Sequence, residues 1–210
     1  MYNIPYFKAD NYEQVLAFMY AHPFIILCGC DVDNSPVATH IPVLIEERNE
    51  KIFLKAHVMR KQKHAVAFEH NQNVLAIFSG AHTYVSATWY HKKEIASTWN
   101  YQAVHAKGTL HWKDENFLHE LLTRLTEKFE NNPHSPSLVK KMTEEYVNNM
   151  MKAIVAFEIE ITSIEHVFKL SQNRDEKSYE NIIEHLNKGD EDSKAVAAAM
   201  KENQHNVFKK

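Results

Sequence analysis

The sequence predicts an α+β fold in which a closed or nearly closed antiparallel β-barrel carries flanking helices. Three observations support this prediction. Short apolar or alternating runs recur at hairpin spacing between residues 23 and 112. Amphipathic helical patterns then dominate between residues 114 and 151. A final alternating run over residues 153–167 returns to the sheet, so we expect one domain over residues 1–174 and a helical extension over residues 175–210.

Composition agrees with a folded domain and excludes some classes of protein. The chain has 210 residues, 44% of them apolar, which is enough to bury a sizeable core. Its formal net charge of −3 argues against a protein that coats nucleic acid through bulk charge, although a local basic site is compatible with it. No signal pattern or run of membrane-spanning length occurs, so we expect a cytoplasmic protein.

The first half of the chain supplies most of the expected strands. Asp10 and Glu13 form a capping box that begins an amphipathic helix ending near Tyr20. Pro42 lies inside an expected strand and indicates an edge position or a bulge. Ile52 and Leu54 alternate with Lys51, Phe53 and Lys55, which predicts a strand with Ile52 and Leu54 on its buried face and the other three on its solvent face. The expected strands cover residues 23–30, 37–47, 51–57, 73–78 continuing to 86, and 101–112, with a hairpin turn at 47–50, a short helix near 60–70 and a loop over 87–98.

Helices dominate the second half. Residues 114–130 place Phe117, Leu121, Leu122 and Leu125 on one face, and a second helix is expected over residues 138–151. After the strand over residues 153–167, the chain from Asp175 is charged and alanine-rich, which predicts further helix.

Several chemistries lack their sequence motifs. The chain has four glycines and contains no G-x-G-x-x-G, no Walker loop and no G-x-S-x-G. Fourteen histidines are scattered without H-E-x-x-H spacing, so we predict no metal site. Cys28 and Cys30 point to the same side of an expected strand but lie too far apart for good disulfide geometry, which predicts buried free thiols and a reducing compartment.

A group of positive charges follows the strand that ends at His57. Arg60, Lys61 and Lys63 lie at or near an expected helix N-terminus, where the helix dipole disfavours cations. A phosphate would resolve this conflict, because free backbone N–H groups and arginine both bind it. On spacing alone, a solvated turn is the favoured interpretation.

Two further segments allow a structural or a functional interpretation. Residues 84–101 contain Trp89, Tyr90, Trp99 and Tyr101, which suit stacking against a planar ligand but are more often core or interface. Residues 168–174, FKLSQNR, are either a polar loop or a source of amide, hydroxyl and guanidinium donors for a ligand.

Taken together, these motifs resemble the PaiB-like family of FMN-binding proteins. The resemblance rests on MYNIPYF at residues 1–7, THIP at 39–42, HVMR at 57–60, FSGAHTYVSATWY at 78–90, TWNYQAVHAKG at 98–108, IVAFEIEIT at 154–162 and KLSQNR at 169–174. That family is similar to the pyridoxamine-phosphate oxidase-like split β-barrels, which are homodimers with FMN in each of two interface clefts. Its members are usually called negative transcriptional regulators.

The resemblance implies a cofactor site built from two subunits. One subunit would place Thr39, His40 and His57 beside the flavin and hold its phosphate with Arg60 and Lys61. The partner subunit would contribute Trp99, Asn100, Tyr101, Lys169 and Arg174.

Two functions follow from the resemblance, and a third stays open. The first is an FMN-dependent oxidoreductase acting on a small molecule, for which no residue is identified as a dedicated proton donor. The second is a flavin-linked regulator, although no helix-turn-helix or strongly basic helix supports direct DNA binding. The third is haem binding or breakdown on the same barrel, with His40, His57 or His105 as axial ligand.

Overall fold

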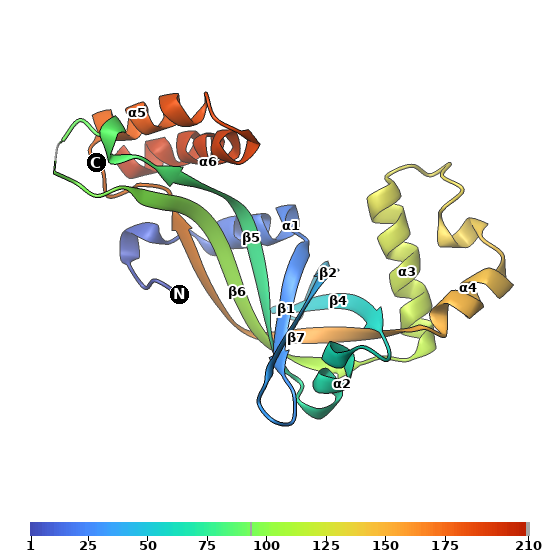
Figure 1. Ribbon diagram of the computed structural model, residues 1–210. Coiled ribbons are helices and arrows are strands. Elements are labelled where there is room, and N and C mark those ends of the chain that lie inside the picture. Colours follow the sequence, from blue (N-terminus) through green and yellow to red (C-terminus); the bar gives the residue numbers. More distant parts are fainter. Residues whose placement is uncertain (93, 209–210) are drawn as a thin grey trace. The chain divides into compact units, whose positions relative to one another are not determined.

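The computed structural model describes residues 1–92 and 94–208, and the expected loop over residues 87–98 therefore includes one position, 93, outside them. Its strands form one sheet with the order β2-β1-β5-β6-β7-β4-β3 (Figure 1). The strands are β1 Phe24–Cys30, β2 Pro36–Pro42, β3 Leu44–Arg48, β4 Lys51–Met59, β5 Asn73–Val85, β6 Thr98–Trp112 and β7 Ile154–Lys169. The helices are α1 Tyr12–Ala21, α2 Lys63–His70, α3 Glu115–Glu130, α4 Glu144–Met151, α5 Glu176–Leu186 and α6 Glu191–Phe208, with short 3-10 turns at η1 Pro5–Phe7, η2 Ala87–Trp89 and η3 Val139–Lys141.

The chain divides into two compact units, each made of segments far apart in sequence. Unit 1 consists of Met1–His22, Ser79–Val104 and Glu165–Lys210, and unit 2 consists of Pro23–Phe78 and His105–Ile164. β5, β6 and β7 each contribute residues to both units.

The expected strand over residues 37–47 is two strands, which corrects the sequence prediction. β2 ends at Pro42 and pairs with β1, whereas β3 begins at Leu44 and pairs with β4. Proline lacks the N–H that would continue a strand ladder, and the Val43 N–H instead donates to the Pro23 carbonyl at 2.8 Å. β2 lies at the edge of the sheet, as Pro42 indicated.

The hairpin into β4 is confirmed. Arg48 pairs with Lys51, and Asn49 and Glu50 between them have φ values of 53° and 62°. Two such residues form the tight turn whose twist matches antiparallel strands.

β4 is buried on both faces, whereas its alternation predicted one buried face. Phe53 and Lys55, expected at the solvent face, are 7% exposed each. The Lys55 ammonium lies 2.7 Å from a Glu46 oxygen and 3.9 Å from a Glu158 oxygen. Because carboxylates from β3 and β7 neutralise it, lysine can occupy a position that its sequence pattern assigned to solvent.

Helices α3 and α4 cover a core cluster of unit 2. Leu118, Leu121 and Leu125 of α3 pack with Val147 and Met151 of α4. Figure 1 draws these two helices next to each other. The predicted α3 is confirmed, with the Asp114 side chain accepting from the Phe117 N–H at 2.9 Å. The predicted helix over residues 138–151 is wrong in extent, because the α-helix begins only after Thr143, which caps it.

Unit 1 has a core cluster formed around α5 and α6, which Figure 1 draws next to each other. Tyr179 is fully buried there, and its hydroxyl donates to the Met200 carbonyl at 2.8 Å. Burial also raises the Tyr179 pKa. The helical prediction from Asp175 onward is thus confirmed through Phe208.

The predicted N-terminal helix is present, but its cap differs from the prediction. Asn11, not Asp10, accepts from the Gln14 N–H at 2.9 Å, and the Gln14 side chain accepts from the Asp10 N–H at 2.9 Å. Asparagine caps helices as well as aspartate does. The sequence therefore contains two overlapping capping-box patterns, Asp10–Glu13 and Asn11–Gln14.

The cysteines are free thiols in β1, as expected. They are half-buried instead of buried, and burial raises the Cys28 pKa.

Candidate functional site

The positive cluster of unit 2 lies at an open helix N-terminus. α2 begins at Lys63, and its N-cap residue Gln62 makes no side-chain capping hydrogen bond. Arg60 and Lys61 are exposed in the turn before it, and the Arg60 N–H donates to the Ala153 carbonyl at 3.0 Å. Neither side chain forms an ion pair with a carboxylate of the described residues. Backbone donors and exposed cations therefore lie together without a carboxylate partner among the described residues.

The other predicted residues of unit 2 lie on strands next to this turn. Thr39 and His40 belong to β2, which contacts both α2 and β4. His40 is exposed, with its ring 6.1 Å from the Phe24 ring, and Thr39 is half-buried. β2, β4 and α2 thus bring all five predicted residues of unit 2 onto contacting elements.

His57 lies on β4 in a partly buried position, two residues before the strand ends. It pairs with Ala156 of β7, and its Nδ1 atom is buried without a hydrogen-bond partner in the described structure. Burial lowers the His57 pKa, which keeps the ring neutral near pH 7.

Unit 1 presents an exposed aromatic group on β5 and β6. Trp99 is 53% exposed, and its ring lies 6.0 Å from the His82 ring and 5.9 Å from the Tyr84 ring. Tyr101 follows two residues later on β6 and is half-buried, and burial together with Tyr2 raises its pKa. Residues two apart on a strand share a face, so Trp99 and Tyr101 offer aromatic surface on one side of β6.

Asn100 is placed differently from its neighbours. It is fully buried, its Oδ1 accepts from the Ser171 hydroxyl at 3.0 Å, and its Nδ2 lies 3.4 Å from the Met200 sulfur. Both ends of the Asn100 amide are therefore engaged within the chain. The hydrogen bond from Ser171 to Asn100 connects β6 to the turn that follows β7.

Lys169 and Arg174 form a pair of like charges in unit 1. Burial and then Arg174 lower the pKa of Lys169, whose ammonium donates to the Thr98 hydroxyl. The Arg174 guanidinium lies 4.6 Å from the centre of the Tyr90 ring, and its Nε is buried without a partner among the described residues. Ser171, at φ 63°, accepts from the Arg174 N–H at 3.0 Å and shapes this turn.

The structure brings the predicted residues together as two groups. Thr39, His40, His57, Arg60 and Lys61 belong to unit 2, and Trp99, Asn100, Tyr101, Lys169 and Arg174 belong to unit 1. Thr98, Ser171 and Tyr90, which position the second group, were not among the predicted cofactor residues. Thr98 is the first residue of the TWNY motif, Ser171 lies inside KLSQNR and Tyr90 belongs to the aromatic segment, so all three motifs carried the signal.

The described residues show neither a metal cluster nor a membrane-spanning helix. No cluster of three or more histidine, cysteine, aspartate or glutamate side chains could hold a metal ion there. None of the described helices is long and apolar enough to cross a membrane.

Two relatives in sequence cover nearly all and about half of the chain. It is 33% identical over 203 residues to the protease synthase and sporulation protein PAI 2 of Bacillus subtilis, an alignment covering 96% of this chain and 97% of that protein. It is also 32% identical over 123 residues to an uncharacterized protein of Saccharomyces cerevisiae, covering 55% of this chain and 73% of that protein.

Solved structures share the fold at low sequence identity. The flavocytochrome Anf3 from Azotobacter vinelandii superposes with a TM-score of 0.57 at 15% identity, covering 86% of this chain and 78% of that one. The FAD and heme binding protein from Mycobacterium smegmatis gives 0.56 at 15% identity, covering 77% and 72%. The predicted α+β antiparallel split barrel is confirmed.

The family assignment rests on a match to most of the chain. The family described as "Putative FMN-binding domain" matches residues 1–163. Together with the near full-length similarity to PAI 2, this confirms the resemblance drawn from the motifs. The chain belongs to this family of FMN-binding domains.

Proposed function

We propose that the protein binds FMN between two copies of itself and acts as a flavin-dependent oxidoreductase on a small molecule. When bound, FMN supplies the electron or hydride transfer. The observation that carries the proposal is that each group of predicted residues holds cations without carboxylate partners in the described structure. One copy contributes Arg60 and Lys61, and its partner contributes Lys169 and Arg174.

The phosphate end of the cofactor fits the start of α2. Gln62 does not cap this helix, so its first N–H groups are open to a phosphate oxygen. Arg60 adds a planar guanidinium that can hold two oxygens, and Lys61 adds a second cation. The residues present therefore fit a dianionic group.

The ring end fits the remaining predicted residues. Trp99 and Tyr101 provide aromatic surface for a planar ring, and Lys169 provides a cation for its polar edge. In this proposal, His57 and Thr39 come from the copy that holds the phosphate and lie beside the ring as neutral groups. Both ends of the Asn100 amide already have partners within the chain. We therefore propose that Asn100 positions the turn that carries Ser171 and does not contact the cofactor.

A regulatory role is the second form of this proposal. The name of the B. subtilis relative refers to protease synthesis and sporulation. The net charge of −3 does not favour direct DNA contact, so regulation would follow from the flavin or its substrate. We also propose a cytoplasmic location, which agrees with free thiols.

Haem is the alternative ligand. The M. smegmatis protein is described as binding FAD and heme, at an identity that shows only a common fold. Of the three candidate axial ligands, His40 is exposed, whereas His57 and His105 are half-buried.

The visible spectrum and the mass in solution test the proposal. We expect two flavin absorption bands after purification or after addition of FMN, and a dimer by light scattering. A Soret band without flavin bands would favour the haem alternative. A protein that takes up neither cofactor would contradict both, and a monomer that binds FMN tightly would contradict the two-copy site.

A further inference from the structure

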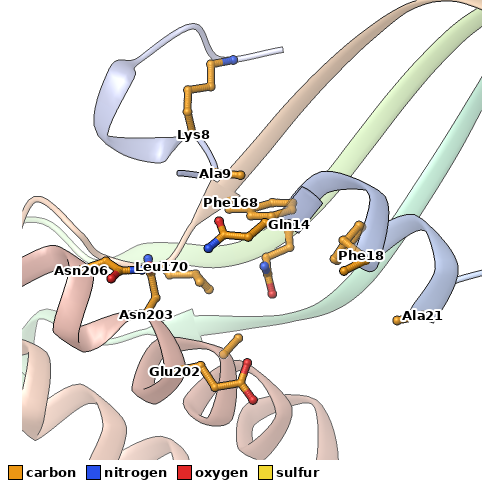
Figure 2. A pocket seen from close by; sticks show the side chains of 13 residues that line it. Lys8, Ala9, Gln14, Phe18, Ala21, Phe168, Leu170, Glu202, Asn203 and Asn206 are labelled. Carbon is orange, nitrogen blue, oxygen red and sulfur yellow. The ribbon is translucent and has the colours of Figure 1, made fainter. Parts of the chain in front are cut away.

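A cavity of about 330 Å³ lies within unit 1 between α1, α6 and the strands β6 and β7 (Figure 2). None of the ten predicted flavin residues lines it. Gln102 and Phe168, which do, are the strand neighbours of Tyr101 and Lys169. Successive side chains of a strand point to opposite faces, so the cavity lies on the side of the strands opposite to Tyr101 and Lys169.

One wall of the cavity is an apolar platform. The Phe18 and Phe168 rings lie 5.1 Å apart between centroids at an interplanar angle of 49°, and Leu170 adjoins them. Both rings are more than 90% buried, at 8% and 7% exposure, so their positions are set by packing. Such a wall gives a ligand a fixed apolar surface, against which a rigid ring system loses less conformational entropy than a flexible chain.

The facing walls carry carboxamides. Figure 2 shows Asn203 and Asn206 projecting from α6 and Gln14 from α1, and Gln102 joins them from β6. Asn206 donates to an Asp10 oxygen at 2.6 Å. Gln102 and Asn203 have no hydrogen-bond partner within the described residues, although both are half-buried. Their donors and acceptors are thus left for a ligand.

The charges around the cavity disfavour an anion. Its one lysine, Lys8, donates to the carbonyls of His166 at 3.0 Å and Tyr2 at 3.4 Å. Glu202 adds an exposed carboxylate to the lining, which would repel a phosphate. The site therefore differs in chemistry from the open N-terminus of α2.

We propose that this cavity binds an uncharged nucleobase or its nucleoside. A carboxamide presents a donor and an acceptor side by side, which matches the edge of a purine or pyrimidine, and the phenylalanine wall supplies apolar contact to its ring. The volume falls in the range of small-molecule sites. A second cavity of about 220 Å³ shares Lys8, Asn203 and Asn206 and adds Asp10, whose carboxylate suits the hydroxyls of a sugar.

This site is independent of the flavin proposal, and calorimetric titration of the full chain, with and without FMN, tests it. The probes are adenine, adenosine, inosine, cytidine and AMP. We expect saturable binding of at least one base or nucleoside, and AMP at least about tenfold weaker than adenosine because of Glu202. Adenosine tighter than adenine would assign the second cavity to the sugar. Failure of every uncharged probe, equal binding of AMP, or displacement of adenosine by FMN would each overturn the proposal.

Two variants locate the bound probe. Gln102→Leu should weaken binding by about 5- to 150-fold through loss of one paired amide contact. Ala17→Phe, at an exposed helical position that lines the cavity, should block binding by filling it while every polar group stays in place. Gln72→Leu, an exposed site in unit 2, is the matched control and should bind as wild type. If both cavity variants bind as wild type with unchanged FMN titration, the probe lies elsewhere and the assignment fails.

Discussion

The two units differ in whether their partly buried cations have carboxylate partners. In unit 2, Lys55 lies between Glu46 and Glu158, and Arg124 and Lys113 pair with the same carboxylates at 3.0 and 3.1 Å. In unit 1, Lys169 and Arg174 face each other, and no ion pair to a described carboxylate accompanies them. A cluster satisfied internally serves stability, whereas cations left without an anion are available to a ligand.

Helix N-termini show the same contrast. Side chains cap α1, α3, α4 and α5, through Asn11, Asp114, Thr143 and Asp175. α2 has no such cap, and it is the helix that follows Arg60 and Lys61. Unit 2 thus combines a closed ion cluster with an open terminus.

The largest expected effect comes from breaking the closed cluster. Glu158→Ala removes a carboxylate that is 5% exposed and leaves Lys55 with Glu46 as its remaining partner. Loss of one member of a buried pair costs about 3 kcal/mol of unfolding free energy. Urea denaturation measures this, with Lys188→Ala in an exposed pair of unit 1 as control. Equal denaturation midpoints for the two variants would show that the cluster does not stabilise the fold.

Arg60→Ala tests the open terminus. Loss of a charge-assisted bidentate contact of about 1.5–3 kcal/mol should weaken FMN binding by about 10- to 150-fold. Riboflavin, which lacks the phosphate, should bind both proteins equally. Lys128→Ala, an exposed change on α3, is the control, and fluorescence titration measures the wild type and both variants. An equal loss of riboflavin affinity would move Arg60 away from the phosphate.

Lys169→Met tests the unpaired cations of unit 1. Without ligand, the variant should unfold at a higher temperature, because it removes a partly buried charge that faces Arg174. With FMN, it should bind less tightly. The lowered Lys169 pKa means that the unfolded chain holds this proton longer, so wild-type stability should rise relative to the variant as pH approaches about 10.5. A variant less stable than wild type throughout would give Lys169 a structural role.

The smallest effect concerns His57. Its pKa is lowered by burial, so the unfolded chain binds more protons below about 6.5 and the fold loses stability as pH falls from there toward the folded pKa. His57→Gln should lose less stability than wild type between about pH 7.5 and 5. Urea midpoints across this range measure the difference, with exposed His70→Gln as control. Parallel pH profiles for wild type and H57Q would refute the buried neutral ring.

Local patterns predicted most elements but not their long-range corrections. The alternation around β4 assigned Lys55 to solvent, because only strand pairing brings its partners Glu46 of β3 and Glu158 of β7 to it. Pro42 signalled an interruption, but only strand pairing could show that β2 and β3 join different neighbours. Thr143 is a helix-capping residue inside the helix predicted over residues 138–151. The apolar spacing of that segment hid the fact that the helix begins only after Thr143.

The site was predicted unevenly for a similar reason. The motifs correctly indicated that Arg60 and Trp99 are accessible, because a residue expected to bind a ligand is also expected at the surface. Asn100 belongs to the same motif, yet strand alternation turns it into the core, where Ser171 and Met200 engage it. The cavity behind β6 joins α1 to α6, and no local pattern could have predicted it.

The segmented make-up of unit 1 has a consequence for the order of folding during synthesis. All residues of unit 2 have been made once the chain reaches Ile164, whereas unit 1 needs the segment from Glu165 onward. We therefore expect the first-made segment, Met1–His22, to wait on the ribosome for its partners while unit 2 collapses. Protease digestion of stalled chains from which Ile164 has emerged but α6 has not should cut within α1 and spare α3. Until α6 emerges, chaperones would meet the apolar face of α1 first.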